Sequence, residues 1–152
     1  MSITYTAFAS YSGTGADTVL CILNPLMSGK KVRLLGINVM SLADSSEFEV
    51  KRWDGIPGVS GGVVSAPVYN TDTSEAAGVT VVRTDPAFDF TGLSVTWQND
   101  LTTYLSDAGD DTTLLFYVPD GCKPILNAGE AITVTLPSGT ADYEFNIYFE
   151  EV

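Results

Sequence analysis

The sequence predicts an all-β fold: an antiparallel, jelly-roll-like β-sandwich with at most one short helix. Eight to ten short runs rich in β-branched and aromatic residues are separated by turn residues, a pattern typical of a sandwich or barrel. Strands do not alternate with helical patterns, and the chain carries neither an internal repeat nor a linker. The connections are uneven in length, which favours two interleaved Greek keys over a regular up-and-down barrel.

The first expected strand lies at 3–9, where apolar and polar side chains alternate weakly, so it is either a first strand or an N-terminal arm. A near-continuous apolar strand follows at 18–23 and ends at Asn24 and Pro25, a turn dipeptide. The run 32–42 is apolar on both faces. This predicts a strand in the middle of the structure that is buried on both sides.

Four further strands are expected before the acidic loop that begins at residue 107. The run 47–53 alternates charged with apolar residues over its first half, and 91–98 alternates along its whole length. The run 63–69 contains Pro67, which places it at a sheet edge or a bulge. A short apolar strand is expected at 79–83.

One helical turn is expected after residue 98. Asn99 or Asp100 could cap it, and Leu101, Tyr104 and Leu105 would then share one face. This would be the only helix of the domain.

The last part of the chain predicts a hairpin. An apolar strand at 113–118 precedes two strands at 131–136 and 142–150, which a Pro-Ser-Gly-Thr break separates. In 142–150 apolar and polar side chains alternate with a period of two, so this strand buries one face. We therefore expect the end of the chain to be fixed in a sheet.

Length and composition favour a single folded domain. The chain has 152 residues, and 45% of them are hydrophobic, which is enough for a core without disulfides or metals. We expect an N-terminal arm or first strand at 1–12 and one β-sandwich domain at 13–152. No apolar run approaches the roughly 18 residues of a membrane helix, and the first residues lack the pattern of a secretory signal.

The charge of the chain argues against several partners and chemistries. Seven Lys and Arg against 19 Asp and Glu give a net charge of −12, so nucleic acid and anionic membranes are poor partners. The seven basic residues are scattered along the sequence, and we expect no basic groove. Histidine is absent, which removes Ser-His-Asp and Cys-His nucleophiles and most zinc sites. We expect no enzyme, no catalytic residue, no cofactor and no metal site.

The two cysteines have different settings. Cys21 lies in an apolar run, where a thiol behaves as a small hydrophobe, and Cys122 lies in a turn. Two free thiols in a reducing cytoplasm are the favoured interpretation. One bridge from the early strand to the late turn is the alternative.

Carboxylates suggest two kinds of site, and for each of them solvent-exposed residues without a binding role are the alternative. Asp107, Asp110 and Asp111 could bind calcium, but their spacing does not fit a calcium-binding loop of the helix–loop–helix type, and solvated loop residues are favoured. Two pairs of glutamates share strand faces and could hydrolyse glycosides if a cleft held them together; they are Glu47 with Glu49 and Glu144 with Glu150. Alternating glutamates usually mark the wet face of a strand. Glu130 is expected to be a turn residue that starts the next strand.

Aromatic and apolar residues suggest binding surfaces. Trp53, Trp97 and Tyr104 could stack on sugar rings, although core packing is favoured for aromatics in an alternating strand. Ile56 and Val59 lie in a Gly/Pro-rich loop that offers little core, so they are candidates for contact with a partner.

Two segments near the end of the chain, 124–134 and 143–151, resemble small jelly-roll virion proteins of tailed bacteriophages. Those proteins commonly finish with a turn of this kind and an acidic last strand. Upstream, 32–39 and 48–52 are similar to early strands of the same group. Tumour-necrosis-factor-like and C1q-like domains share a similar late turn.

The resemblance implies a head decoration or cement protein that binds the major capsid protein on the outer capsid surface. It implies a homotrimer made in the bacterial host cytoplasm. The N-terminal segment could then reach a neighbour and add a strand to its edge. The candidate contact residues are therefore Ile3, Tyr5, Phe8, Ile56 and Val59. A carbohydrate- or receptor-binding module of a phage tail or fibre is the second hypothesis, and an enzyme using Asp/Glu chemistry is the third.

Overall fold

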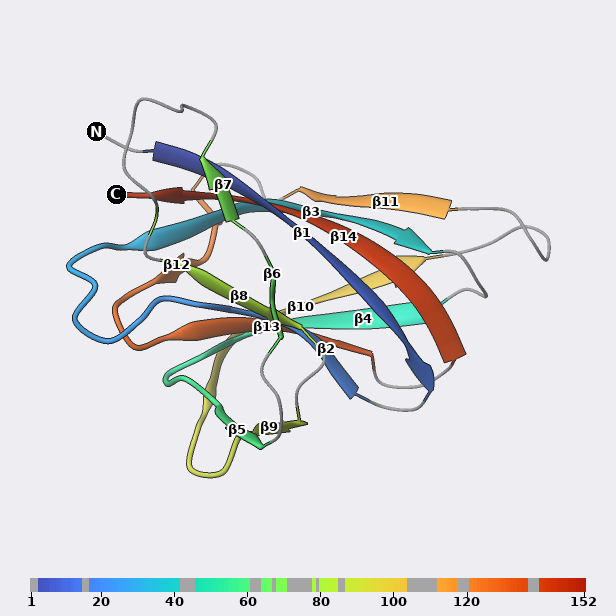
Figure 1. The fold of residues 1–152 in the computed structure, drawn as a ribbon, viewed down its shortest axis with the longest axis horizontal. Helices are drawn as coiled ribbons and strands as arrows, with labels where there is room; N and C mark the ends of the chain where they lie inside the picture. Colours follow the sequence, from blue (N-terminus) through green and yellow to red (C-terminus); the bar gives the residue numbers. More distant parts are fainter. Residues whose placement is uncertain are drawn as a thin grey trace.

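The computed structural model describes residues 3–14, 17–41, 46–60, 64–66, 68–70, 78, 80–84, 87–103, 112–117, 121–136 and 140–152. Within these residues the fold is all-β and contains no helix. Two antiparallel sheets pack face to face, and a small two-stranded ribbon lies beside one of them (Figure 1). The predicted β-sandwich is confirmed.

The first sheet has six strands in the described part of the chain. Its order is β11-β3-β14-β1-β7, and β12 pairs with the first half of β3, on the same edge as β11. The bounds of its strands are β1 (Ile3–Thr14), β3 (Val32–Ser41), β7 (Val68–Asn70), β11 (Thr112–Tyr117), β12 (Ile125–Leu126) and β14 (Thr140–Glu151).

The second sheet also has six described strands, in the order β10-β4-β13-β2-β8-β6. Their bounds are β2 (Asp17–Leu23), β4 (Ser46–Trp53), β6 (Val64–Ala66), β8 (Val81–Thr84), β10 (Val95–Thr103) and β13 (Ala131–Leu136). The ribbon consists of β5 (Gly58–Ser60) and β9 (Ala87–Asp89).

The strand pairs are nested along the chain. β1 pairs with β14, β2 with β13, β3 with β11 and β12, and β4 with β10, so the first half of the chain is matched in reverse by the second. Successive pairs alternate between the two sheets.

The core lies between the two sheets and is built from alternate residues of the long strands. Tyr5 stacks on Phe149 with ring centroids 5.5 Å apart, and Phe48 meets Phe145 edge-on at 6.0 Å. All four rings are buried, which removes large apolar areas from water and is the main source of stability here. The predicted alternation of the last strand is confirmed, because the odd-numbered residues from 145 to 149 point into the core.

One buried carboxylate closes the core at its end. Glu151 is the last residue of β14, and its side chain is 2% exposed and points inward like those of the core residues of this strand. Its Oε1 accepts hydrogen bonds from the backbone N–H of Thr80 at 2.8 Å and from the Thr80 hydroxyl at 2.7 Å. The penultimate residue of the chain is thus tied to the segment that leads into β8.

Several sequence predictions need correction. The helical turn expected after residue 98 is wrong over 99–103, which belong to β10 and pair with β4; Tyr104 and Leu105 lie outside the described residues. β3 does lie inside its sheet, but only its inward face is buried, since Arg33 and Leu35 are half-exposed on the other face. The expected strand 63–69 is two strands, β6 and β7, at the edges of different sheets.

Candidate functional site

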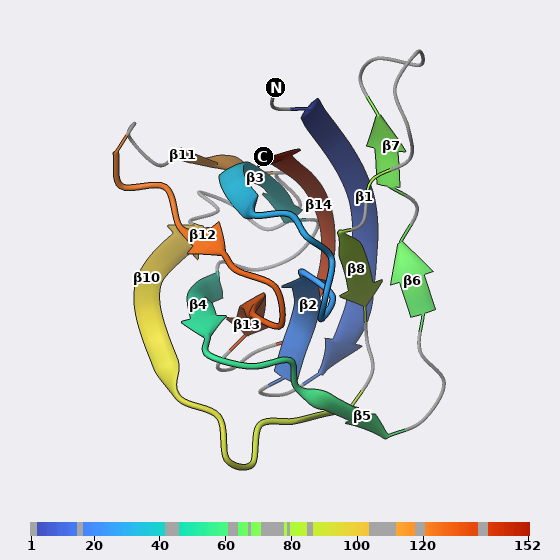
Figure 2. The same ribbon diagram turned by 90° about the vertical axis from the view of Figure 1, so that its left-hand side faces the viewer.

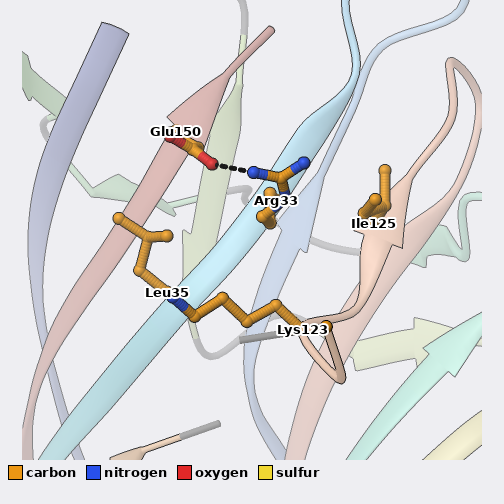
Figure 3. A pocket seen from close by; sticks show the side chains of 6 residues that line it. Arg33, Leu35, Lys123, Ile125 and Glu150 are labelled. Carbon is orange, nitrogen blue, oxygen red and sulfur yellow. Dashed lines mark hydrogen bonds and ion pairs between the residues drawn. The ribbon is translucent and has the colours of Figure 1, made fainter. Parts of the chain in front are cut away.

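A groove of about 470 Å³ lies against the outward face of β3 (Figure 3). One wall of the groove is formed by outward-pointing side chains of β3 and β14, which alternate with core residues along each strand. The segment leading into β12 forms the opposite wall. The lining residues are Arg33, Leu35, Gly121, Lys123, Ile125 and Glu150.

The charged groups of this groove largely engage one another. Arg33 and Glu150 are opposite each other in the β3–β14 register, and the guanidinium donates to Glu150 Oε1 in an ion pair. Lys123 extends across the groove toward Leu35 (Figure 3). The groove therefore holds one paired carboxylate and a second cation, so an anionic ligand would have to compete with Glu150 for Arg33.

The cations of the chain gather at this end of the molecule. Arg52 Nη1 donates to the carbonyl of Ile125 at 3.1 Å, and Ile125 pairs with Arg33. Lys30 and Lys31 immediately precede β3, and the backbone of Lys31 exchanges two hydrogen bonds with Val152. Five of the seven basic residues thus surround the end where β12 lies, which faces the viewer in Figure 2. The basic residues are scattered along the sequence, yet five of the seven gather in three dimensions.

The turn between β2 and β3 is rigidly braced. Asn24 is fully buried, and its Nδ2 donates to the carbonyls of Lys30 at 2.8 Å and Leu126 at 3.2 Å. The Ser28 hydroxyl accepts from the Lys30 N–H at 3.2 Å. These bonds fix both arms of the turn against β12.

The tip of this turn presents apolar side chains to solvent. Leu26 is 76% exposed and Met27 is 95% exposed. Met27 has a φ of 60°, in the left-handed region that glycine prefers. A bulky side chain in that conformation is strained by about 1–2 kcal/mol, so the backbone here favours a glycine that the sequence does not supply.

A second braced turn supports the first. Asn127 donates its backbone N–H to Glu130 Oε2 at 2.8 Å, and the Asn127 amide reaches the same carboxylate. Gly129 has a φ of 86°, and a Cβ at this position would lie 2.7 Å from Leu26 Cδ2. Glu130 is a turn residue directly before β13, as expected.

The structure separates the five candidate contact residues. Tyr5 is buried in the core, so its ring is not available to a partner, and Ile3 packs partly against the same core. Phe8 is 45% exposed on the outward face of β1. Ile56 packs against the small cluster around Cys21, and Val59 lies half-exposed in β5. Residues 3–14 form one strand that pairs along its length with β14 on one edge, and residues 5–7 pair with β7 on the other edge.

The tryptophans are anchored within the protein. Trp53 stacks on Phe90 with centroids 4.4 Å apart, and its Nε1–H donates to Thr133 Oγ1 at 2.8 Å. Phe88 lies 6.1 Å from Phe90 and extends this aromatic group along the ribbon. Trp97 packs partly against the main core. Packing is thus the main role of both indoles, and Tyr104 lies outside the described residues.

Two of the glutamates that the sequence analysis singles out are held by cations in the described part of the chain. Glu49 forms an ion pair with Lys51 at 2.6 Å, and Glu150 is held by Arg33. Among the described side chains no group of three or more metal-ligating residues occurs. The acidic loop at 107–111, which is expected to be solvated, and the side chain of Glu47 lie outside the described part.

Two of the described side chains have a displaced pKa. Hydrogen bonds from Thr91 hold the pKa of the exposed Asp89 carboxyl below its ordinary value. Burial raises the pKa of the Cys21 thiol to about 12, and the charge of Arg83 opposes this rise only partly. Cys21 is buried and Cys122 is exposed, and both thiols are free, so the alternative of a bridge between them does not hold in this structure.

Sequence reasoning missed the exposed turn at Leu26 and Met27. The signal was present, because two apolar residues stand between the turn residues Pro25 and Ser28, the same pattern that singled out Ile56 and Val59. It also missed Tyr69, which is 59% exposed on β7.

Comparisons with protein-family models, curated proteins and solved structures found no match. In the described residues there is no helix with the length and apolar character needed to cross a bilayer. The function therefore has to be inferred from the geometry of the chain itself.

Proposed function

We propose that this protein is a structural component of a virus particle, a decoration or cement protein that binds the outer surface of a capsid and stabilises the shell. The observation that carries the proposal is the nested pairing of β1 with β14, β2 with β13, β3 with β11 and β4 with β10. We infer that this nesting is a jelly roll, a fold that recurs in viral capsid proteins and lectins.

The charge and the groove support a role in binding rather than catalysis. A net charge of −12 keeps a protein soluble at the high concentration that coating a shell requires. In the described groove Arg33 and Glu150 already hold each other. The exposed apolar side chains lie instead on protruding or outward-facing surfaces.

The proposed partners are the major capsid protein and further copies of this chain, assembled as a homotrimer. Many weak contacts repeated over a shell add up to strong attachment, so no single contact has to be large. The proposed location is the outer capsid surface after synthesis in the bacterial cytoplasm. Two free cysteines fit synthesis in a reducing compartment.

Co-sedimentation tests this proposal. Shells would be assembled from the major capsid protein encoded near this gene, and the purified protein would be added at rising concentration. We expect saturable pelleting at a fixed ratio to the capsid subunit. A protein that stays in the supernatant at every concentration would refute capsid binding. Bovine serum albumin of similar acidity serves as the control for trapping in the pellet.

A carbohydrate- or receptor-binding module of a tail or fibre is the second candidate. The exposed rings of Phe8 and Tyr69 favour it, because both lie on the outward side of the first sheet and exposed aromatic rings can stack on sugars. A glycan array gives the test: a hit that Tyr69→Ala abolishes would favour this candidate over capsid binding.

A further inference from the structure

We infer that copies of this chain associate head to tail, with the turn between β2 and β3 of one copy seated on the outward face of the first sheet of the next. The inserting part, which we name the docking tip, consists of Leu26, Met27, Lys30 and Lys31. The receiving part, the receptor face, consists of Phe8, Tyr69, Glu144 and Tyr148. This inference rests on the self-assembly that the proposed function includes, and it assigns surfaces to it.

The docking tip is built to stay in place while its side chains face water. Asn24 and Ser28 fix its arms, and Gly129 leaves room for Leu26 to lie over the neighbouring turn. Met27 is almost fully exposed in a strained left-handed conformation. A strained, exposed and apolar side chain contributes nothing to the monomer, and backbone strain of this kind concentrates at binding sites. A rigid tip also loses little conformational entropy when it docks.

The receptor face is an aromatic strip with the carboxylate of Glu144 at one end. Thr6 stands opposite Tyr148 on one side and Tyr69 on the other, so these two tyrosines lie in one row across β14, β1 and β7. Phe8 occupies the next row, opposite Asn146. Phe8 and Tyr69 are 45% and 59% exposed, which makes them two of the large apolar side chains that the described surface presents.

Charge selects a second copy as the occupant of this face. The net charge is −12, and five of the seven cations surround the end that carries the docking tip. Outside that end the remaining cations are Lys51, which pairs with Glu49, and Arg83. Two copies therefore repel in most orientations, and contact is favoured when the lysines of the tip approach the acidic body, where Glu144 follows the aromatic rows.

The two surfaces are different parts of the molecule, so the contact is heterologous. Each copy offers one tip and one face, and a head-to-tail contact of this type closes into a ring when its rotation allows. A closed ring of three copies is the arrangement that the proposed homotrimer would adopt.

Sedimentation equilibrium of complementary variants tests the inference. The tip variant carries Leu26→Ser and Met27→Ser, and the face variant carries Phe8→Thr and Tyr69→Thr, since threonine keeps strand propensity. We expect each variant alone to associate at least about tenfold more weakly than the wild type. An equimolar mixture of the two should form a 1:1 dimer and nothing larger, because only one intact tip and one intact face can meet.

Charge variants and a matched control complete the design. Lys31→Glu should weaken association, and Glu144→Lys combined with it should restore part of the loss. Val95→Ser removes an apolar side chain that is 43% exposed on β10, in the other sheet, and should leave association unchanged. Melting temperatures close to wild type show that each variant is folded, and Lys31→Glu carries the test if the serine variants are not.

Three results would overturn the inference: a wild-type protein that is monomeric at every concentration, tip and face variants that assemble like the wild type, or a mixture that stays monomeric. Failure of the capsid proposal is separate. A protein that pellets with shells but keeps its assembly in both variants would retain the proposed function and lose this interface. A protein that assembles through the docking tip but does not pellet with shells would retain this interface and lose the proposed function.

Discussion

Replacing Glu151 by alanine should destabilise the fold far more than the same change at its neighbour Glu150. The two residues are adjacent in β14 and point to opposite faces. Glu151 is buried and accepts two hydrogen bonds from Thr80, whereas Glu150 forms an ion pair with Arg33 on the outward face. The pair is a matched comparison of a buried and a partly exposed carboxylate.

The magnitude follows from the two bonds that Glu151 accepts. A hydrogen bond to a charged group contributes about 1.5–3 kcal/mol, and its loss leaves the buried N–H and hydroxyl of Thr80 unpaired. Glu151→Ala should therefore lower the free energy of unfolding by about 3 kcal/mol or more, which corresponds to about 6–12 °C in melting temperature. Glu150→Ala should cost about 1 kcal/mol or less, as a partly exposed ion pair does.

Equilibrium urea unfolding at neutral pH measures both changes, provided that the m-value stays constant. Both hydrogen bonds from Thr80 go to Oε1, so Glu151→Gln, whose amide oxygen can still accept them, should cost clearly less than alanine. Thr80→Val in the Glu151→Ala background should cost less than in the wild type, since the partner of the hydroxyl is already gone. Equal losses at 150 and 151 would refute the reasoning.

Three further predictions concern single positions. The pKa of the Cys21 thiol is about 12 in the fold against 9.0 ordinarily. Between these two pH values the unfolded chain has lost this proton and the folded chain keeps it, so the free energy of unfolding should fall by about 1.4 kcal/mol per pH unit. Cys21→Ala should remove that slope in pH-dependent unfolding, and an unchanged slope would contradict the prediction. Met27→Gly relieves the left-handed strain and should raise the free energy of unfolding by about 0.5–1 kcal/mol in urea titrations, whereas a loss would mean that Met27 packs. Gly78→Ala places a Cβ 2.8 Å from Glu151 Oε1 and 2.9 Å from the Tyr5 ring, so it should destabilise by about 1–3 kcal/mol; thermal melting checks this, and an unchanged melting temperature would show that the contact relaxes freely.

Much of the fold could be predicted because one-sided burial leaves a period-two pattern. The run 142–150 shows this pattern most clearly, and its inward residues form the core against β1 and β3. The predicted closing hairpin is wrong, since 131–136 and 142–150 are adjacent in sequence yet lie in different sheets. Period and turn signals do not reveal which sheet a strand joins.

Local patterns failed where a distant strand decides the structure. The segment after residue 98 contains candidate cap residues and a helical spacing, but pairing with β4 extends 99–103 as a strand, since tertiary context overrides such weak local preferences. The gathering of cations around β12 could not be predicted from the sequence either. Arg33, Arg52 and Lys123 are brought together only by the pairing of β3 with β12 and by the hydrogen bond from Arg52 to Ile125.

The candidate surfaces could be predicted only in part. Phe8 was identified and is exposed, but Tyr5 was identified and is buried, because a weakly alternating strand does not say which face is inward. Leu26 and Met27 could have been found from the same signal that picked the 54–62 loop. Their rigidity depends on Asn24, whose bonds reach residues that are distant in the sequence.

The most direct test of the proposed function is a three-dimensional reconstruction of the virus particle to which we propose that this chain belongs. We predict a density on the outer capsid surface into which two packed sheets fit, with neighbouring copies joined by the turn that carries Met27. An outer shell fully explained by other proteins, with this chain absent from purified particles or confined to the tail tip, would contradict the account.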